Sequence, residues 1–172
     1  MTWPANGLTK IELLVCMGVI GLLTVIGAAG WRQVLPTYRL DVCIRGLCTA
    51  TQIARIRSIR DNTVVTVTLD ARKRRYEAFV DDGSGAGATA KNGIRESMER
   101  LIVSRALPAG IEVHRVTFPA KRLRFNSRGM PQGGGSFYLK NARDQYKGIS
   151  VGFSGSITIK TSTNGGRTWK KL

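Results

Sequence analysis

Residues 13–31 read LLVCMGVIGLLTVIGAAGW, nineteen consecutive residues without a charged side chain. As a helix rising about 1.5 Å per residue, this stretch is roughly 28 Å long, which matches the hydrocarbon core of a bilayer. A cleaved secretory signal is the alternative. Its basic leading segment is missing, however, and the apolar run exceeds the usual length of about 7–15 residues. We therefore predict that residues 8–31 form the transmembrane half of a long N-terminal helix.

Residues 32–62 continue the helical pattern but become amphipathic, because apolar or small side chains recur at spacings of three and four. This face consists of Leu40, Ile44, Leu47, Thr51 and Ala54, and it is widened by Ile53, Ile56 and Ile59. Pro36 lacks a backbone donor and crowds the preceding turn, so we expect it to bend or break the helix. Cys43 and Cys48 lie five positions apart on this helix, which is too far for an unstrained disulfide.

From residue 63 to residue 172 the sequence indicates a β-rich head. Runs of β-branched and aromatic residues alternate with turn signals, as expected of short antiparallel strands. The glycine-rich stretch at 81–93 is predicted to be a loop. The predicted strands are Val64–Leu69, Arg74–Val80, Arg100–Leu107, Ile111–Phe118, Arg122–Asn126, Ser136–Lys140, Gly148–Phe153 and Ser156–Ser162. The expected fold class is α+β, with the long N-terminal helix packed on a sandwich-like head.

Composition restricts the classes of function. The chain has 172 residues, enough for one domain with a helical appendage, and 42% of them are hydrophobic, so it is not a disordered chain. Its 27 Lys and Arg residues outweigh 11 Asp and Glu residues, giving a net charge of +16. Such a charge predicts attraction to an anionic partner, whether nucleic acid, acidic lipid or an acidic protein face. A single histidine excludes sites built from several imidazoles, and three cysteines make a disulfide framework improbable.

The segment GLTKIE, residues 7–12, combines a glycine, an apolar residue and a glutamate ahead of the apolar run. It resembles the class III leader junction of type IV pilins and type II secretion pseudopilins. In that family a prepilin peptidase cuts after the glycine and methylates the new N-terminal amine. The resemblance implies that residues 1–7 are a leader peptide, that cleavage falls between Gly7 and Leu8, and that Leu8 is N-methylated.

Glu12 has a physical reason to lie at this position. A carboxylate at the start of a membrane span is costly unless it is paired. When such helices stack with an axial stagger, the N-terminal amine of one subunit can reach the carboxylate of its neighbour, which relieves both charges and sets the register. A glutamate that merely faces lipid headgroups is the alternative. We predict that Glu12 is the subunit-docking residue.

Three stretches beyond the leader junction narrow the family resemblance to a smaller group. The stretches at 39–70, 123–139 and 148–159 are similar to the GspH/FimT group of minor pilins and pseudopilins. The group implies a minor pilin or pseudopilin at or near the tip of a type IV pilus or type II secretion pseudopilus. It also implies an inner-membrane, single-pass location with a cytoplasmic N-terminus and an external head. Other pilin subunits, the prepilin peptidase and the inner membrane are then the expected partners.

The sequence gives no support for an enzyme. His114 is a lone histidine in a predicted strand, and the chain contains no P-loop, no GxSxG and no metal-ligand spacing. We predict a non-enzyme without a cofactor or metal.

DNA binding is the alternative function, because some members of the group bind DNA through basic residues near the C-terminus. The end of this chain offers cations for phosphates and one ring for base stacking, namely Arg167, Trp169, Lys170 and Lys171. Only the first half of the group's GRxR-like signature is present here. Basic residues also occur in nearly every predicted strand, which favours a general role in solubility or contact with acidic neighbours.

Overall fold

A computed structural model of the chain describes residues 9–84, 91–96 and 98–172, except for the side chains of residues 26–29 and 32. The chain divides into two compact units, Met1–Leu35 (unit 1) and Pro36–Leu172 (unit 2). One helix, α1 (Lys10–Arg60), contributes residues to both units. Pro36 lies inside this helix, at the boundary between the units.

The prediction of a long N-terminal helix is confirmed, whereas that of a transmembrane first half is not. A membrane-spanning helix needs about 20 consecutive and predominantly apolar residues. Within the described part of the chain, no helix has both the length and the apolar character that crossing a membrane requires. The predicted transmembrane span at 8–31 is therefore not found, whereas the predicted helix is present from Lys10 onward.

The second half of α1 buries one face in unit 2. Leu40, Ile44 and Leu47 are at most 1% exposed, as are Thr51 and Ala54. The spacing of three and four residues therefore predicted the buried face correctly. Ile56 and Ile59 were expected to widen it, but they are 63% and 51% exposed. Near its C-terminal end the helix thus presents a narrower buried face than its isoleucines indicate.

Nine strands follow the helix within the described residues, and the eight predicted ones are all present with bounds shifted by at most a few residues. The ninth, a two-residue strand at the C-terminus, was missed because it is too short to show any periodicity. The strands are β1 (Val65–Asp70), β2 (Arg75–Val80), β3 (Leu101–Ala106), β4 (Ile111–Val116), β5 (Arg122–Phe125), β6 (Gly135–Asn141), β7 (Tyr146–Val151), β8 (Ile157–Ser162) and β9 (Lys170–Lys171).

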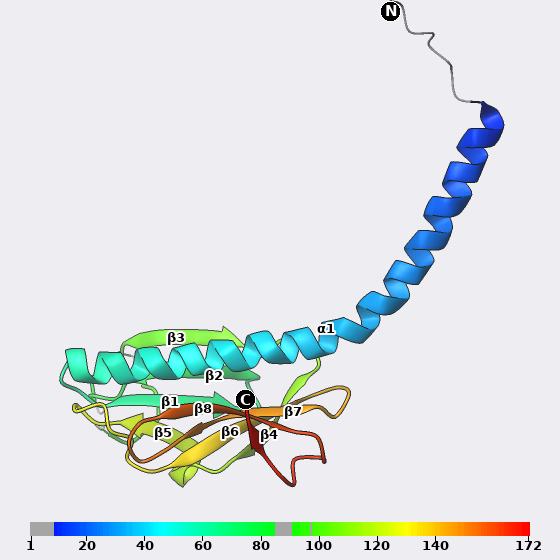
Figure 1. Ribbon diagram of the computed structural model, residues 1–172. Helices are drawn as coiled ribbons and strands as arrows, with labels where there is room; N and C mark the ends of the chain where they lie inside the picture. The colour runs from blue at the N-terminus through cyan, green and yellow to red at the C-terminus, as the bar shows by residue number, and fades with distance from the viewer. Residues whose placement is uncertain (1–8, 85–90, 97) are drawn as a thin grey trace, which may run out of the picture. The chain divides into compact units, whose positions relative to one another are not determined.

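The strands form two antiparallel sheets. Sheet A has the order β3-β2-β1-β5, and sheet B has the order β4-β6-β7-β8-β9. The hairpin of β1 and β2 pairs Val65 with Val80 and Asp70 with Arg75. A β-bulge at His114 interrupts the pairing of β4 with β6, because the register shifts between Val113 and Arg115. Within unit 2, residues 36–60 of α1 lie along the sheets (Figure 1).

A single hydrophobic core joins the helix to both sheets. It contains Leu47 from α1, Val67 from sheet A and Leu139 from sheet B, each 0% exposed. Because one cluster serves all three elements, none of them can bury its apolar face without the others. The sequence prediction of an α+β protein is thereby confirmed.

Arg55 links α1 to two loops at one end of the sheets. Its Nε donates a hydrogen bond to the carbonyl oxygen of Gly129 (3.1 Å), and its Nη1 donates one to that of Gly155 (3.0 Å). Both glycines have a positive φ, 72° and 77°, which L side chains rarely adopt. A Cβ at Gly155 would also lie 2.9 Å from the guanidinium carbon of Arg55. These loops therefore need glycine both for backbone conformation and for space.

We expect Arg55→Ala to lower the free energy of unfolding by about 2–3 kcal/mol, because it removes two hydrogen bonds from a charged donor. Urea denaturation of the full chain measures this change. Arg45→Ala is the matched control, since Arg45 is an exposed arginine of the same helix. Its effect should stay within about 0.5 kcal/mol. Equal destabilisation by both substitutions would contradict the role of Arg55.

Candidate assembly interface

Glu12 takes part in a capping box at the start of α1. The Oε2 of Glu12 accepts a hydrogen bond from the backbone N–H of Thr9 (3.2 Å), and the Oγ1 of Thr9 accepts one from the backbone N–H of Glu12 (3.3 Å). The Thr9 hydroxyl also donates to the same carboxylate oxygen (3.2 Å). Two backbone donors that the helix cannot satisfy are thus paired reciprocally. Glu12 therefore has a defined orientation and a structural role within its own chain.

Thr9 is a site residue that the sequence analysis missed. The signal was present, because a threonine followed three positions later by a glutamate, just before an apolar run, is the sequence signature of a capping box. Gly7 and Leu8, the residues expected to flank the cleavage point, lie outside the described residues. Of the predicted assembly residues, the structure therefore places Glu12.

Unit 1 exposes apolar side chains on every side of its helix. Leu13, Leu14 and Val15 are consecutive and so point in different directions, yet they are 53%, 72% and 57% exposed. Leu22 and Val25 are 67% and 71% exposed. A contiguous apolar surface of this kind marks a region that interacts with another protein or with lipid. Unit 1 is therefore the strongest candidate for an interaction site.

The C-terminal residues predicted to contact nucleic acid lie on or beside β9. Arg167, Lys170 and Lys171 are exposed. The ring of Trp169, however, is stacked on that of Tyr138, with centroids 3.9 Å apart and an interplanar angle of 24°. One face of the indole is therefore occupied by a residue of β6. The structure brings the cations and the ring together, but it uses Trp169 to attach β9 to the sheet.

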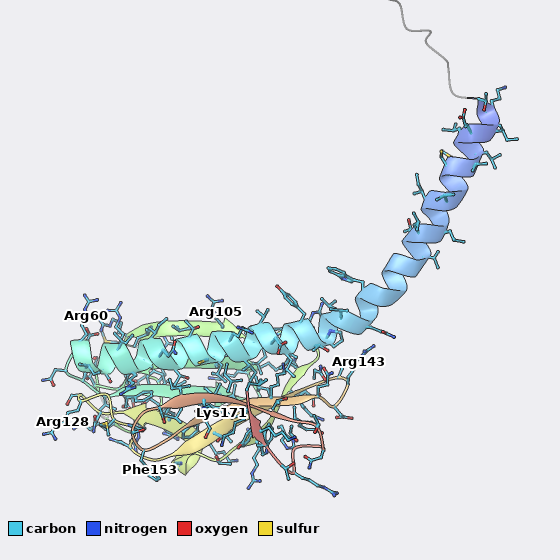
Figure 2. All side chains as sticks on the ribbon, in the orientation of Figure 1. Arg60, Arg105, Arg128, Arg143, Phe153 and Lys171 are labelled. Carbon is cyan, nitrogen blue, oxygen red and sulfur yellow. The ribbon has the colours of Figure 1, made fainter. Side chains whose placement is uncertain are left out.

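Positive charge is spread over unit 2 and is not gathered at its C-terminus. Figure 2 shows arginines and lysines on separate elements, including Arg60 at the end of α1, Arg105 on β3 and Arg143 after β6. Several acidic groups pair with such cations, for example Asp41 with Lys147 and Asp61 with Arg100. This distribution agrees with the view that basic residues serve the whole surface.

The other chemically reactive groups have structural positions. Cys43 is buried in the core, and this burial raises the pKa of its thiol to about 11, so it stays protonated at neutral pH. All three cysteines are free.

The acidic side chains of unit 2 also have structural positions. The carboxylate of Glu99 is buried and accepts hydrogen bonds from the backbone N–H groups of Gly83 and Glu96. Among the described residues, no group of three or more His, Cys, Asp and Glu side chains could hold a metal ion.

A comparison with known protein families finds a match that lies within unit 2. Residues 44–165 match the family model described as "Type II transport protein GspH". This match covers more than half of the chain. The chain belongs to the GspH family. Its matched region begins in α1 and ends after β8, so it includes most of the buried helix face, all of sheet A and sheet B without β9.

Solved structures of similar fold are those of minor pilin subunits. The minor pseudopilin EpsH from the type 2 secretion system of Vibrio cholerae has a TM-score of 0.51 at 13% sequence identity, covering 69% of this chain and 94% of EpsH. The type IV minor pilin FimU of Pseudomonas aeruginosa has a TM-score of 0.55 at 13% identity, covering 75% of this chain and 96% of FimU. At such identities the likeness shows a shared fold. No curated protein sequence matches significantly.

We expect Thr9→Ala to loosen the first turn of α1, because the amide of Glu12 loses its acceptor and a lost N-cap costs about 1 kcal/mol. Hydrogen exchange at the Glu12 amide of the full chain should then quicken by about fivefold. Thr9→Ser keeps the hydroxyl and should exchange as the unaltered chain does. An unchanged rate in Thr9→Ala would show that the capping box does not hold the turn.

Proposed function

We propose that this GspH-family protein is a minor pilin or pseudopilin, a structural subunit at or near the tip of a type IV pilus or of a type II secretion pseudopilus. The observation that carries the proposal is the exposed apolar surface of unit 1, whose side chains are left uncovered by the described residues. Side-by-side packing of such helices from neighbouring subunits would bury this surface. Gly18 and Gly21 leave open space beside the helix, which allows neighbouring backbones to approach closely.

Glu12 is the docking residue in this proposal. The carboxylate is exposed in the single chain, so it can accept a second partner besides the Thr9 amide. Cleavage after Gly7 would leave a charged amine on Leu8, one residue before the capping threonine. When two subunits pack with a stagger, the amine of one and the carboxylate of the other would neutralise each other in apolar surroundings. The capping box supports this role because it fixes the carboxylate in place.

The remaining partners follow from the same proposal. Other pilin or pseudopilin subunits would contact unit 1, and a prepilin peptidase would process the junction of Gly7 and Leu8. The inner-membrane location stays a prediction from the resemblance. The protein acts in this proposal as an assembly component and not as a catalyst.

DNA uptake is not favoured by a specific observation. One face of the Trp169 ring is occupied by Tyr138, and exposed arginines such as Arg60 and Arg105 lie on other elements (Figure 2). The DNA-binding alternative therefore stays a prediction from the resemblance.

The charge of Glu12 can be tested separately from its capping role. Glu12→Gln keeps the acceptor for the Thr9 amide, since glutamine also completes a capping box, but it removes the negative charge. We expect incorporation into filaments to fall on the order of tenfold, because a neighbouring amine would be left unpaired in an apolar interface. Quantifying the protein in sheared filaments, in a strain without the native copy, measures this.

Two controls make the outcome decisive. Lys10→Gln removes an adjacent exposed charge from the same turn and should assemble normally. Hydrogen exchange at the amide of Thr9 should be unchanged in Glu12→Gln, which confirms that the cap is intact. Normal incorporation of Glu12→Gln would contradict the docking role.

A further inference from the structure

A cleft with a basic rim lies between the β1–β2 hairpin of sheet A and strand β4 of sheet B, both in unit 2. Its volume is about 760 Å³, within the range of roughly 300–1,000 Å³ that ligand pockets occupy. Two apolar side chains of the core, Leu69 and Phe79, line it together with the half-buried Val113 and Val116. We call it the basic cleft because its rim carries Arg72, Lys73, Arg95, Arg115, Lys121 and Arg122.

The cations of the basic cleft have no acidic partner in the part of the chain that the structure describes, although Arg122 donates hydrogen bonds to the carbonyl oxygens of Ala120 and Asn92. No carboxylate of the described residues lies within ion-pair distance of any of the six. Two carboxylates also line the cleft, and each has hydrogen-bond partners of its own. Asp70 accepts hydrogen bonds from the backbone N–H groups of Arg72 (2.8 Å) and Lys73 (3.0 Å). Glu77 pairs with Arg75 (3.3 Å) and accepts a bond from Ser104 (3.2 Å). The rim thus carries six cations against two carboxylates, so an anion in the cleft would meet an excess of positive charge.

Two irregularities of the backbone occur in the walls of the basic cleft. The β-bulge of β4 is at His114, and bulges are frequent where a strand must redirect a side chain toward a site. Ala120 and Lys121 are consecutive non-glycine residues with positive φ, 50° and 56°. Such conformations cost energy and gather at ligand-binding sites.

The cleft suits an extended peptide better than a nucleic acid. Base recognition on single strands needs exposed rings for stacking. Here the ring of Phe79 is 1% exposed, and the ring of His114 packs edge-on against Tyr146. β4 is an edge strand of sheet B, so it can pair with an added strand through its backbone. The half-buried Val113 and Val116 would receive alternate side chains of that strand.

We propose that the basic cleft binds an extended acidic segment of another protein, with apolar side chains between its carboxylates. Carboxylates would contact rim cations such as Arg115 and Lys121, while the apolar side chains would lie on Val113 and Val116. A second copy of this chain is a poor partner, because 27 basic residues outweigh 11 acidic ones. The proposal goes beyond filament assembly and does not depend on the role of Glu12.

A labelled peptide of four Glu-Val repeats tests the proposal with the full chain, by fluorescence anisotropy at about 0.1 M salt. Peptides of four Gln-Val repeats and of four Glu-Ser repeats separate the two parts of the recognition. We expect binding of the Glu-Val peptide, and at least fivefold weaker binding of each of the others, since one lacks charge and the other apolar side chains. No binding of the Glu-Val peptide, or equal binding of the Gln-Val peptide, would overturn the proposal.

Charge-matched variants locate the site. Arg115→Gln with Lys121→Gln should raise the dissociation constant about tenfold or more, because two charged donors of the cleft are lost. Arg105→Gln with Arg143→Gln removes the same charge at exposed positions outside the cleft (Figure 2) and should change it less than twofold. A thermal melt of each variant checks the fold. Equal losses of affinity in both double variants would indicate attraction by the diffuse charge of the whole surface. Displacement of the labelled peptide by oligo-dT at a lower concentration than unlabelled Glu-Val peptide would indicate a nucleic-acid site. Either result would overturn the proposal.

Discussion

The burial of one face of α1, from Leu40 to Ser58, against two β-sheets is the interaction on which the rest of unit 2 depends. One core cluster includes side chains from the helix and from both sheets, so the three bury their apolar faces together. Arg55 then fixes the end of the helix to the loops at Gly129 and Gly155.

The same helix has opposite surface chemistry in its two halves. In unit 2 its apolar side chains are buried, whereas in unit 1 residues such as Leu14 and Leu22 are largely exposed. A single chain does not bury the apolar side chains of the half in unit 1, so the contacts that cover them come from outside the chain. In the proposed function, that exposed half packs against neighbouring subunits of a filament, a role that membership of the GspH family and a fold shared with minor pilin subunits support. The basic cleft would add a separate contact on the head.

Periodicity made most of the fold predictable, because the helix face at Leu40 and Ile44 and eight of the strands follow from the spacing of apolar residues. The features of unit 2 that the sequence did not predict depend on tertiary contacts. The exposure of Ile56 and the stacking of Trp169 on Tyr138 are decided by which element lies opposite, and local sequence does not contain that information. The basic cleft likewise joins β1, β2 and β4, which only the fold brings together.

The N-terminus of the mature protein tests the central claim most directly, namely that the chain is a processed filament subunit. Intact-mass and N-terminal peptide analysis of the protein from peptidase-positive cells should show a chain that begins at Leu8 and carries one added methyl group. Gly7→Ala should weaken or block this processing, since the cleavage pocket must admit a bare backbone. A protein that still begins at Met1 in those cells would contradict the assignment as a pilin or pseudopilin.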